Sequence, residues 1–412
     1  MELKRYKLGE ICPEFHAGNG IQSSQIKGSG LYPVFGGNGL RGYTDTFNQD
    51  GQYLIIGRQG AYCGNVRYNV GKAFLTEHAI VGQTSAEHNA IYLACKLSLM
   101  NLAQFQGQSA QPVLSVKNLS EIEILMPPKK IQDNIARVIL NIDHKIALNR
   151  AINQNLEAMA KQLYDYWFVQ FDFPNEEGKP YKSSGGEMVW NEKLKRYIPK
   201  GWNISLIKEI AATYSGGTPK STNIEYYNNG EIAWINSGEL NSPIITKTTN
   251  YITKCGLENS SAKLYPSNSI LVAMYGATAG KVCLLTFEAC SNQAVCGVIP
   301  TIENMLYYVY FHISSLYNHF VTLSTGSARD NISQETIKNI LLPIPYSNIL
   351  KLFDEKIGSI YQMIINNSQQ IDSLAKQRDE LLPLLMNDQV SVNSDLSVFY
   401  IVIFKYYASS VN

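Results

Sequence analysis

Few residues of this 412-residue chain have the types and spacing needed to make or break a covalent bond. Glu177 and Lys179 fit the E-x-K half of a nuclease site. They lie, however, in a segment rich in Gly, Pro, Ser and charge, and no convincing acidic residue on a strand precedes them. We therefore expect no catalytic residue here and interpret the protein as non-catalytic.

Motifs for phosphate and metal binding are absent as well. The sequence contains no G-x-x-x-x-G-K-[ST] loop, no H-E-x-x-H and no paired Cys/His spacing, so we expect neither a metal nor a cofactor in this chain. Seven cysteines without C-x-x-C spacing indicate reduced, mostly buried thiols in a cytoplasmic protein. With a net charge of +1, any contacts to nucleic acid must come from local basic residues.

The segment 129–171 is the element that must position its neighbours. Its apolar residues recur at steps of three and four, and neither Pro nor Gly interrupts them. This spacing predicts a long amphipathic helix that pairs with another helix. The residues of the predicted seam are Ile131, Ile135, Val138, Ile142, Ile152, Leu156, Met159 and Leu163.

A second copy of this pattern occurs 218 positions later, in the segment 347–388, where Ile349 repeats Ile131. Two such helices can pair antiparallel as a coiled coil with a pseudo-twofold internal repeat. Asn149 and Asn367 occupy equivalent positions, where they either meet and fix the register or lie at the seam edge in water. The predicted pairing residues are Ile135, Ile142, Asn149, Leu156, Phe353, Ile360, Asn367 and Leu374.

The segments 1–128 and 202–346 have a sequence pattern typical of short strands and turns, with a helix or two. In the first we predict buried strands at 53–57 and 79–82, a helix over 88–100 and a strand over 122–126. The resulting fold class is α+β, with two α/β globules separated by the two-helix coiled coil. Residues 172–201 read as a connector with little core of its own, and the apolar tail 389–412 is unassigned.

The two globules repeat one plan but carry different loops. Residues 269–276 echo 53–60, and 292–295 echo 77–80. Scaffold positions match, whereas loop residues mostly do not, which favours two related tasks with different targets. The alternative is a duplicated coiled-coil structural or adaptor protein without DNA binding, which would also retain matching scaffold positions.

Several local runs carry a family resemblance. The chain reads YWFVQFDFP at 166–174, GKPYKSSGG at 178–186, IPKGW at 198–202 and SGGTP at 215–219. Together with the repeated plan of globule and helix, these runs resemble the specificity subunit of a type I restriction-modification system. The first globule departs from the pattern, because residues 17–20 read AGNG in place of a Gly-Gly-Thr-Pro loop, which suggests a differently built reading loop.

The resemblance implies a role for each segment. Residues 1–128 and 202–346 would be two target-recognition domains that read the halves of a bipartite site in double-stranded DNA. Residues 129–171 and 347–388 would be the central and distal conserved helices, which set the spacer and dock two methyltransferase subunits. Two restriction subunits would complete the complex, and S-adenosylmethionine, ATP and magnesium would belong to these partners.

Loop residues with hydrogen-bonding side chains are the candidates for reading DNA. Arg suits guanine and Gln suits adenine by bidentate geometry, and hydroxyl groups suit phosphates. For any one of them, a solvated surface side chain is the alternative interpretation. The candidates are Arg41, Arg58, Gln59, Tyr62, Gln108 and Gln111 in the first globule, and Ser215, Thr218, Lys220, Tyr275, Thr278, Lys281, Ser327 and Arg329 in the second.

Overall fold

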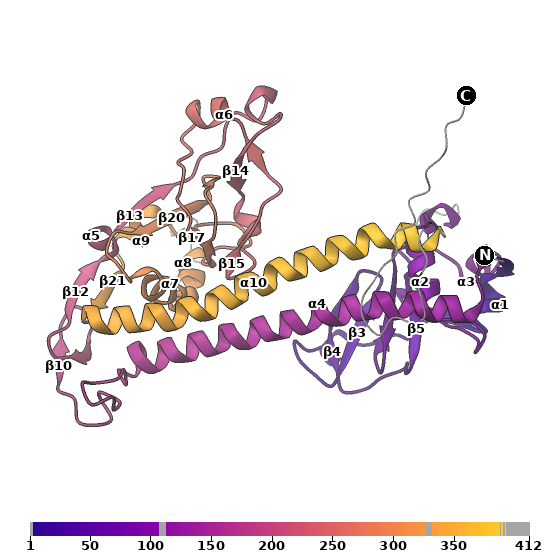
Figure 1. Ribbon diagram of the computed structural model, residues 1–412, viewed down its shortest axis with the longest axis horizontal. Coiled ribbons are helices and arrows are strands. Elements are labelled where there is room, and N and C mark those ends of the chain that lie inside the picture. Colours follow the sequence, from indigo (N-terminus) through magenta and orange to yellow (C-terminus); the bar gives the residue numbers. More distant parts are fainter. Residues whose placement is uncertain (1–2, 107–112, 326–331, 388, 390–391, 393–412) are drawn as a thin grey trace. The chain divides into compact units, whose positions relative to one another are not determined.

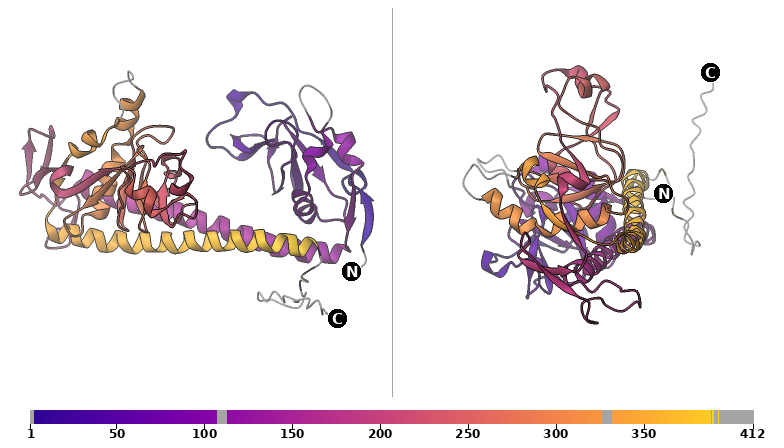
Figure 2. Two further views of the ribbon diagram at one scale, coloured as in Figure 1. Left: turned by 90° about the horizontal axis from the view of Figure 1, so that it is seen from above. Right: turned by 90° about the vertical axis from the view of Figure 1, so that its left-hand side faces the viewer.

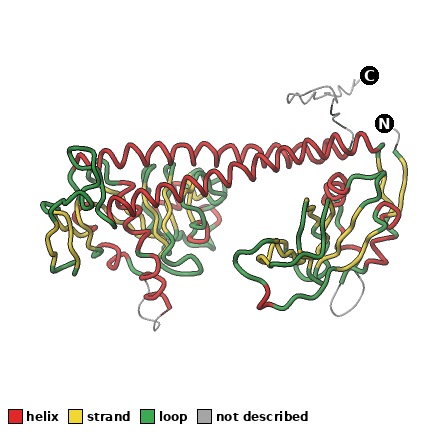
Figure 3. The backbone as a smooth tube through the Cα atoms, turned by 90° about the horizontal axis from the view of Figure 1, so that it is seen from below, coloured by secondary structure: helices red, strands yellow, loops and turns green. Residues whose placement is uncertain are grey.

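The computed structural model describes residues 3–106, 113–325 and 332–387, together with 389 and 392. The chain divides into two compact units. Unit 1 comprises 1–147 and 372–412, and unit 2 comprises 148–371. Both combine strands and helices in a mixed α/β fold, in which short strands and loops accompany two long helices (Figure 3). Within the described ranges, none of the helices has the length and apolar character that a membrane crossing requires.

Unit 1 contains a four-stranded sheet in the order β2-β8-β5-β6, a three-stranded sheet β4-β3-β7 and the pair β1-β9. Its strands are β1 (Lys4–Lys7), β2 (Glu14–Ala17), β3 (Tyr32–Gly36), β4 (Gly39–Thr44), β5 (Gln52–Gly57), β6 (Val66–Val70), β7 (Phe74–Leu75), β8 (Ala79–Gln83) and β9 (Glu123–Met126). Its shorter helices are α1 (Leu8–Ile11), η1 (Ser23–Gln25), α2 (Ala90–Ser98), η2 (Leu102–Phe105) and α3 (Val116–Ser120).

The strand β5 is the centre of unit 1 because both of its faces are covered. Leu54 and Ile56 join the cluster that α2 and the start of α4 complete, whereas Tyr53 and Ile55 face a second cluster around Leu75. Continuous burial of apolar residues explains why this run was recognisable as a strand. The predictions for β5, β8, β9 and α2 are confirmed to within two residues at each end.

Unit 2 repeats this plan with sheets in the orders β13-β20-β17-β18-β15 and β16-β14-β19, the pair β12-β21 and the hairpin β10-β11. Its strands are β10 (Met188–Asn191), β11 (Arg196–Pro199), β12 (Asn203–Leu206), β13 (Ala211–Ser215), β14 (Ile232–Ile235), β15 (Ile244–Ile245), β16 (Tyr251–Ile252), β17 (Ser269–Ala273), β18 (Val282–Leu285), β19 (Cys290–Ser291), β20 (Val295–Pro300) and β21 (Leu341–Ile344). Its shorter helices are α5 (Ile207–Ile210), η4 (Ile224–Tyr226), η5 (Ser237–Glu239), α6 (Lys254–Glu258), α7 (Leu306–Ser315), α8 (Tyr317–Thr325) and α9 (Gln334–Lys338).

The two long helices are α4 (Lys129–Tyr164), continued by the π-helical turn η3 (Asp165–Val169), and α10 (Ser347–Met386). Within unit 2 they run side by side and antiparallel (Figures 1 and 2), as Asn149 bonds to Gln370 and Asn153 to Ser368. Within unit 1, the guanidinium of Arg378 on α10 donates to the Asp143 carboxylate on α4 at 2.9 Å. Each unit thus contains a stretch of paired helices.

The seam of α4 differs from the predicted one in its second half. Ile152 and Met159 are 38% and 56% exposed, so they lie off the helix contact. The positions of the seam are taken instead by Asn153 and Ala160, which are buried. The prediction was wrong there because it followed apolar residues, whereas this helix pair buries a polar residue and satisfies it with hydrogen bonds.

Residues 172–201 were predicted to have little core, and this was also wrong. Phe173 is 2% exposed and stacks on Tyr181 and Trp202, at ring-centroid distances of 4.7 and 5.2 Å. Ile198 on β11 is 1% exposed and joins the same cluster. Aromatic burial therefore anchors this segment to unit 2, although its composition is that of a linker.

The seven cysteines are all free thiols. Five of them are buried, which confirms the prediction that most are buried, while Cys63 is partly exposed and Cys255 exposed. Burial raises the pKa of the Cys12, Cys95 and Cys283 thiols to about 12.

Candidate nucleic-acid interface

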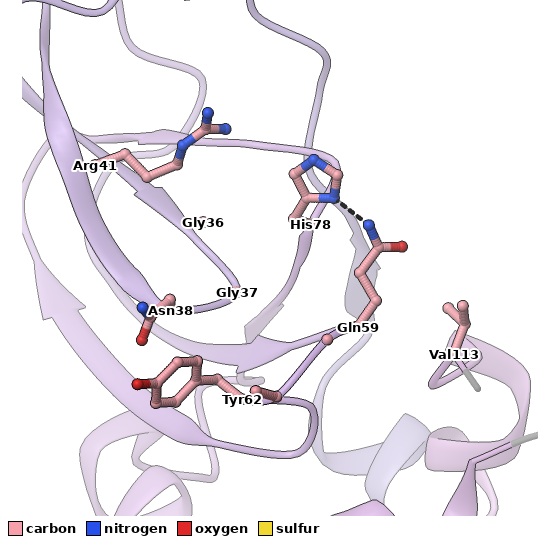
Figure 4. Close-up of a pocket in the computed structure, with 10 residues that line it drawn as sticks. Gly36, Gly37, Asn38, Arg41, Gln59, Tyr62, His78 and Val113 are labelled. Carbon is pink, nitrogen blue, oxygen red and sulfur yellow. Dashed lines mark hydrogen bonds between the residues drawn. The ribbon is translucent and has the colours of Figure 1, made fainter. Parts of the chain in front are cut away.

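A pocket of about 730 Å³ in unit 1 collects three of the predicted reading residues. Arg41 comes from β4, whereas Gln59 and Tyr62 come from the turn that follows β5 (Figure 4). All three are exposed, and none of the described residues forms an ion pair with Arg41. The complete lining is Gly36, Gly37, Asn38, Arg41, Gln59, Gly60, Ala61, Tyr62, His78 and Val113.

Close backbone contacts hold the loops of this pocket together. A Cβ on Gly57 would lie 2.3 Å from the Tyr62 carbonyl oxygen and 2.8 Å from that of Gly37. A Cβ on Gly37 would in turn lie 2.9 Å from the His78 carbonyl oxygen. Only glycine permits such approaches, so the three loops meet because Gly37 and Gly57 lack side chains.

Gln59 forms a hydrogen bond that no sequence motif predicts. Its Nε2 lies 2.5 Å from Nδ1 of His78, and Nε2 of His78 lies 3.3 Å from a carboxylate oxygen of Glu77. His78 and Asn38 were not among the predicted residues, although both line the pocket. The contact joins residues 19 positions apart and depends on the pairing of β5 with β8.

Arg58 does not line the pocket. It is partly buried, its Nη1 lies 3.4 Å from the Glu77 carbonyl oxygen, and its backbone N–H donates to the His78 carbonyl at 3.0 Å. Its own carbonyl accepts from the Leu114 N–H at 2.9 Å. Arg58 therefore ties three segments together, and a base-reading role has less geometric support for it than for Arg41.

The turn after β17 in unit 2 reproduces the backbone of the turn after β5. The hydrogen bond from the Arg58 N–H to the His78 carbonyl corresponds to one from the Met274 N–H to the Ala294 carbonyl, at 2.8 Å. The Gly64 N–H donates to Gly57 at 2.8 Å, and the Gly280 N–H donates to Ala273 at 2.9 Å. These bonds and the strand registers make Tyr275 of unit 2 the equivalent of Gln59 in unit 1, as the sequence repeat predicts.

At β8 and β20, the alignment of unit 1 with unit 2 differs by one residue from the predicted alignment. Gly57 pairs with Ala79, and Ala273 pairs with Val295. Gln293 is therefore the counterpart of Glu77, and Ala294 that of His78. The prediction aligned Gln293 with His78, because short apolar runs leave a one-residue shift undetermined.

The Gly-rich loop of unit 2 has a counterpart in unit 1 after all. The Gly216 and Gly217 N–H groups donate to Val295 and Ser291, at 3.0 and 2.8 Å. Gly18 and Asn19 make the same bonds to Ala79 and Leu75, at 2.9 and 3.0 Å. The prediction of a differently built loop is thus wrong for these two positions, since the backbone frame is shared.

A glycine is required at the first position of both loops. A Cβ on Gly18 would lie 2.4 Å from the Leu75 carbonyl oxygen, and one on Gly216 would lie 2.1 Å from that of Asn292. These distances leave no room for a side chain. The shared glycine therefore follows from close packing of the loop against the strand ends.

The side chains on this frame differ between the units. In unit 2, Thr218 is exposed and its hydroxyl bonds to the Gln293 amide oxygen, and Lys220 is exposed. Tyr275 is 38% exposed, and partial burial raises the pKa of its phenol, which is therefore a neutral donor and acceptor. Where unit 1 presents an amide, unit 2 presents a phenol.

The remaining candidates of unit 2 have structural partners. Ser215 is partly buried, and its hydroxyl donates to Gln334 at 2.9 Å. Lys281 is partly buried, and its Nζ donates to Asn241 at 2.8 Å. Thr278 is 5% exposed and donates to the Ser237 carbonyl at 2.8 Å, so the structure removes it from the exposed candidates. Gln108, Gln111, Ser327 and Arg329 lie outside the described residues.

Comparison with known proteins places this geometry in a family. The model of the type I restriction modification DNA specificity domain matches residues 2–158 and 199–378. The chain belongs to this family. The two matched segments each contain one set of paired sheets and one frame of glycine turns, so the family domain occurs twice in the specificity chain.

Similar proteins agree with this assignment. The MjaIX specificity subunit of Methanocaldococcus jannaschii is 25% identical over 419 residues, which cover 95% of this chain and 94% of that protein. The EcoprrI specificity subunit of Escherichia coli is 41% identical over 147 residues, or 35% of this chain and 36% of that protein. The crystal structure of an S subunit from M. genitalium has the same fold, with a TM-score of 0.62 at 15% identity over 93% of this chain and 96% of that one.

Proposed function

We propose that this chain gives a type I restriction-modification complex its DNA sequence specificity. Membership of the specificity-domain family supports this role, and so do relatives that are named specificity subunits. The observation that carries the proposal is the backbone frame shared by the two units. Because Tyr275 stands where unit 1 has Gln59, the same frame presents different hydrogen-bonding groups, as two readers of different sequences require.

In this proposal each unit reads one half of a bipartite site in double-stranded DNA. Arg41, Gln59 and Tyr62 contact base edges or phosphates from the pocket of unit 1, and Thr218, Lys220 and Tyr275 do so in unit 2. The helices α4 and α10 contribute residues to both units. They form the coiled coil that sets the spacer between the half-sites.

The catalytic steps belong to partners of this chain. Two methyltransferase subunits dock on the helices, and two restriction subunits complete the complex. S-adenosylmethionine, ATP and magnesium bind those partners, which leaves recognition as the task of the chain described here.

A binding experiment with the assembled complex tests the proposal. The chain is purified with its methyltransferase partner and titrated with a randomised duplex library across a range of salt concentrations. We expect enrichment of a two-part sequence and an affinity that falls steeply as salt rises. A complex that assembles but enriches no sequence would support a duplicated structural or adaptor protein instead, a role with which the net charge of +1 is compatible.

A further inference from the structure

The row of contacts from Glu77 through His78 to Gln59 determines which groups of Gln59 remain free. Nε2 of His78 lies 3.3 Å from Oε1 of Glu77. A neutral imidazole that carries its hydrogen on Nε2, the nitrogen facing this carboxylate, has an unprotonated Nδ1, which can only accept. The other carboxylate oxygen of Glu77 is buried and has no hydrogen-bond partner among the described residues. Within the described chain, His78 is therefore the side chain that engages this carboxylate.

This tautomer fixes the orientation of the Gln59 carboxamide. Since Nδ1 of His78 accepts, the atom 2.5 Å away must be the Gln59 nitrogen and not its oxygen. One N–H of Gln59 is then occupied. The second N–H and Oε1 have no partner among the described residues, the Gln59 side chain is exposed, and its oxygen points away from His78 (Figure 4).

A free donor next to a free acceptor on one amide matches a particular base edge. Adenine presents N7 as an acceptor and its N6 amino group as a donor in the major groove, and a glutamine amide pairs with both. Thymine and cytosine offer no such adjacent pair. A reversed amide would lose this match, because His78 would then occupy the oxygen and leave only N–H groups.

We propose that His78 is a positioning residue for base recognition, which holds the Gln59 amide in the orientation that selects adenine in the half-site read by unit 1. This inference rests on the proposed function and extends it to one residue pair and one base. Unit 2 has Ala294 at the position of His78 and Tyr275 at that of Gln59. The pair of His78 and Gln59 therefore acts on the half-site read by unit 1 only.

The test uses the assembled complex and compares the wild-type chain with Gln59→Ala, His78→Ala and the double variant. Bound sequences are recovered from the randomised duplex library. We expect one adenine in one half-site of the wild-type target, and we expect each single variant to lose about tenfold to a hundredfold of the preference for it. All other positions should keep their preference, and the double variant should lose no more than Gln59→Ala.

Two further variants sharpen the result. His16→Ala is the matched control, because His16 is an exposed histidine of unit 1 that bonds only to the Ala17 carbonyl among the described residues, at 2.9 Å. It should leave the recovered sequence unchanged. Gln59→Glu presents acceptors only and should shift the preference at the same position toward cytosine.

The outcomes separate this inference from the proposed function. If the wild-type complex selects a two-part sequence but Gln59→Ala or His78→Ala leaves the adenine preference intact, the inference is overturned and the function stands. A uniform loss of affinity over all positions in a folded His78→Ala complex also overturns it. If the wild-type complex selects no sequence, the proposed function itself fails.

Discussion

The amide of Asn367 on α10 donates to Oδ1 of Asn153 on α4 at 2.9 Å. Asn153 is 8% exposed, and its own Nδ2 lies 3.2 Å from the Ser368 hydroxyl. Asn149 bonds to Gln370 at 3.3 Å. Asn149 and Asn367 thus pair with other residues, and the polar contact of the two helices centres on Asn153.

We expect this polar contact to fix the register of the helix pair. Asn153→Leu leaves the Asn367 amide without its acceptor and should lower the free energy of unfolding of unit 2 by about 1–3 kcal/mol. The double variant Asn153→Leu with Asn367→Leu should recover much of that loss, because both polar groups are then removed. Denaturant unfolding of the four proteins in a double-mutant cycle measures the coupling.

The register is measured separately in the double variant. If the asparagines specify it, cysteine cross-linking between α4 and α10 should give one product in the wild-type chain and several in the double variant. A single, unchanged cross-link would show that apolar packing alone sets the register.

Sequence reasoning succeeded where one physical signal dominated. Four successive apolar residues identified β5, because a strand covered on both faces needs them. It failed at Asn153, since the adjacent Ile152 suggested an apolar seam that the helix does not use. A period of three and four residues defines a face only to within one position.

The candidate site was predictable only in part, for reasons of distance along the chain. Gln59 was recognisable because it follows a strand at a glycine turn. His78 was not, because its contact with Gln59 requires the β5–β8 pairing. The equivalence of Gly18 and Gly216 could not be predicted from the sequence, because the loops that follow them differ in length. The backbone hydrogen bonds that show the equivalence exist only in the folded chain.

The second prediction concerns the glycine shared by the two loops. Gly18→Ala places a Cβ 2.4 Å from the Leu75 carbonyl oxygen, so the loop must shift. We expect a loss of about 1–3 kcal/mol in the free energy of unfolding of unit 1, together with weaker DNA binding. Gly20→Ala is the control, because nothing lies within 4 Å of its Cβ. Equal thermal stability of the two variants would contradict the steric argument.

The third prediction distinguishes two roles of Arg41. This exposed side chain borders the pocket, and none of the described residues forms an ion pair with it. Arg41→Ala should weaken binding of the assembled complex by about 1–3 kcal/mol. If the guanidinium of Arg41 forms two hydrogen bonds to a guanine edge, Arg41→Lys should not restore the preference at that base.

The phosphate alternative for Arg41 has a different signature. In that case Arg41→Lys should restore affinity, and Arg41→Ala should reduce the slope of log affinity against log salt by about one without changing the recovered sequence. Lys27→Ala is a control of similar charge in the same unit, because Lys27 is already paired with Asp45 at 2.7 Å.

The fourth prediction is a dependence of stability on pH that arises at His312 in unit 2. Its Nε2 donates to the Leu341 carbonyl at 3.1 Å, and its Nδ1 accepts from the Tyr164 hydroxyl at 3.3 Å. Burial lowers the pKa of this imidazole to about 4, against an ordinary value of 6.5, so the folded chain holds it neutral. The unfolded chain takes up a proton below about pH 6.5, and this uptake favours unfolding as the pH falls.

Stability should therefore be complete above about pH 6.5 and decline by about 2–3 kcal/mol as the pH falls toward 4, where the folded chain also becomes protonated. His312→Gln keeps a donor for the Leu341 carbonyl but cannot titrate. Denaturant unfolding of unit 2, followed by hydrogen exchange between pH 7 and pH 4, should give a shallower slope for this variant than for the wild-type chain. Identical slopes would place the proton uptake at another residue, since His312 would then be protonated equally in both states.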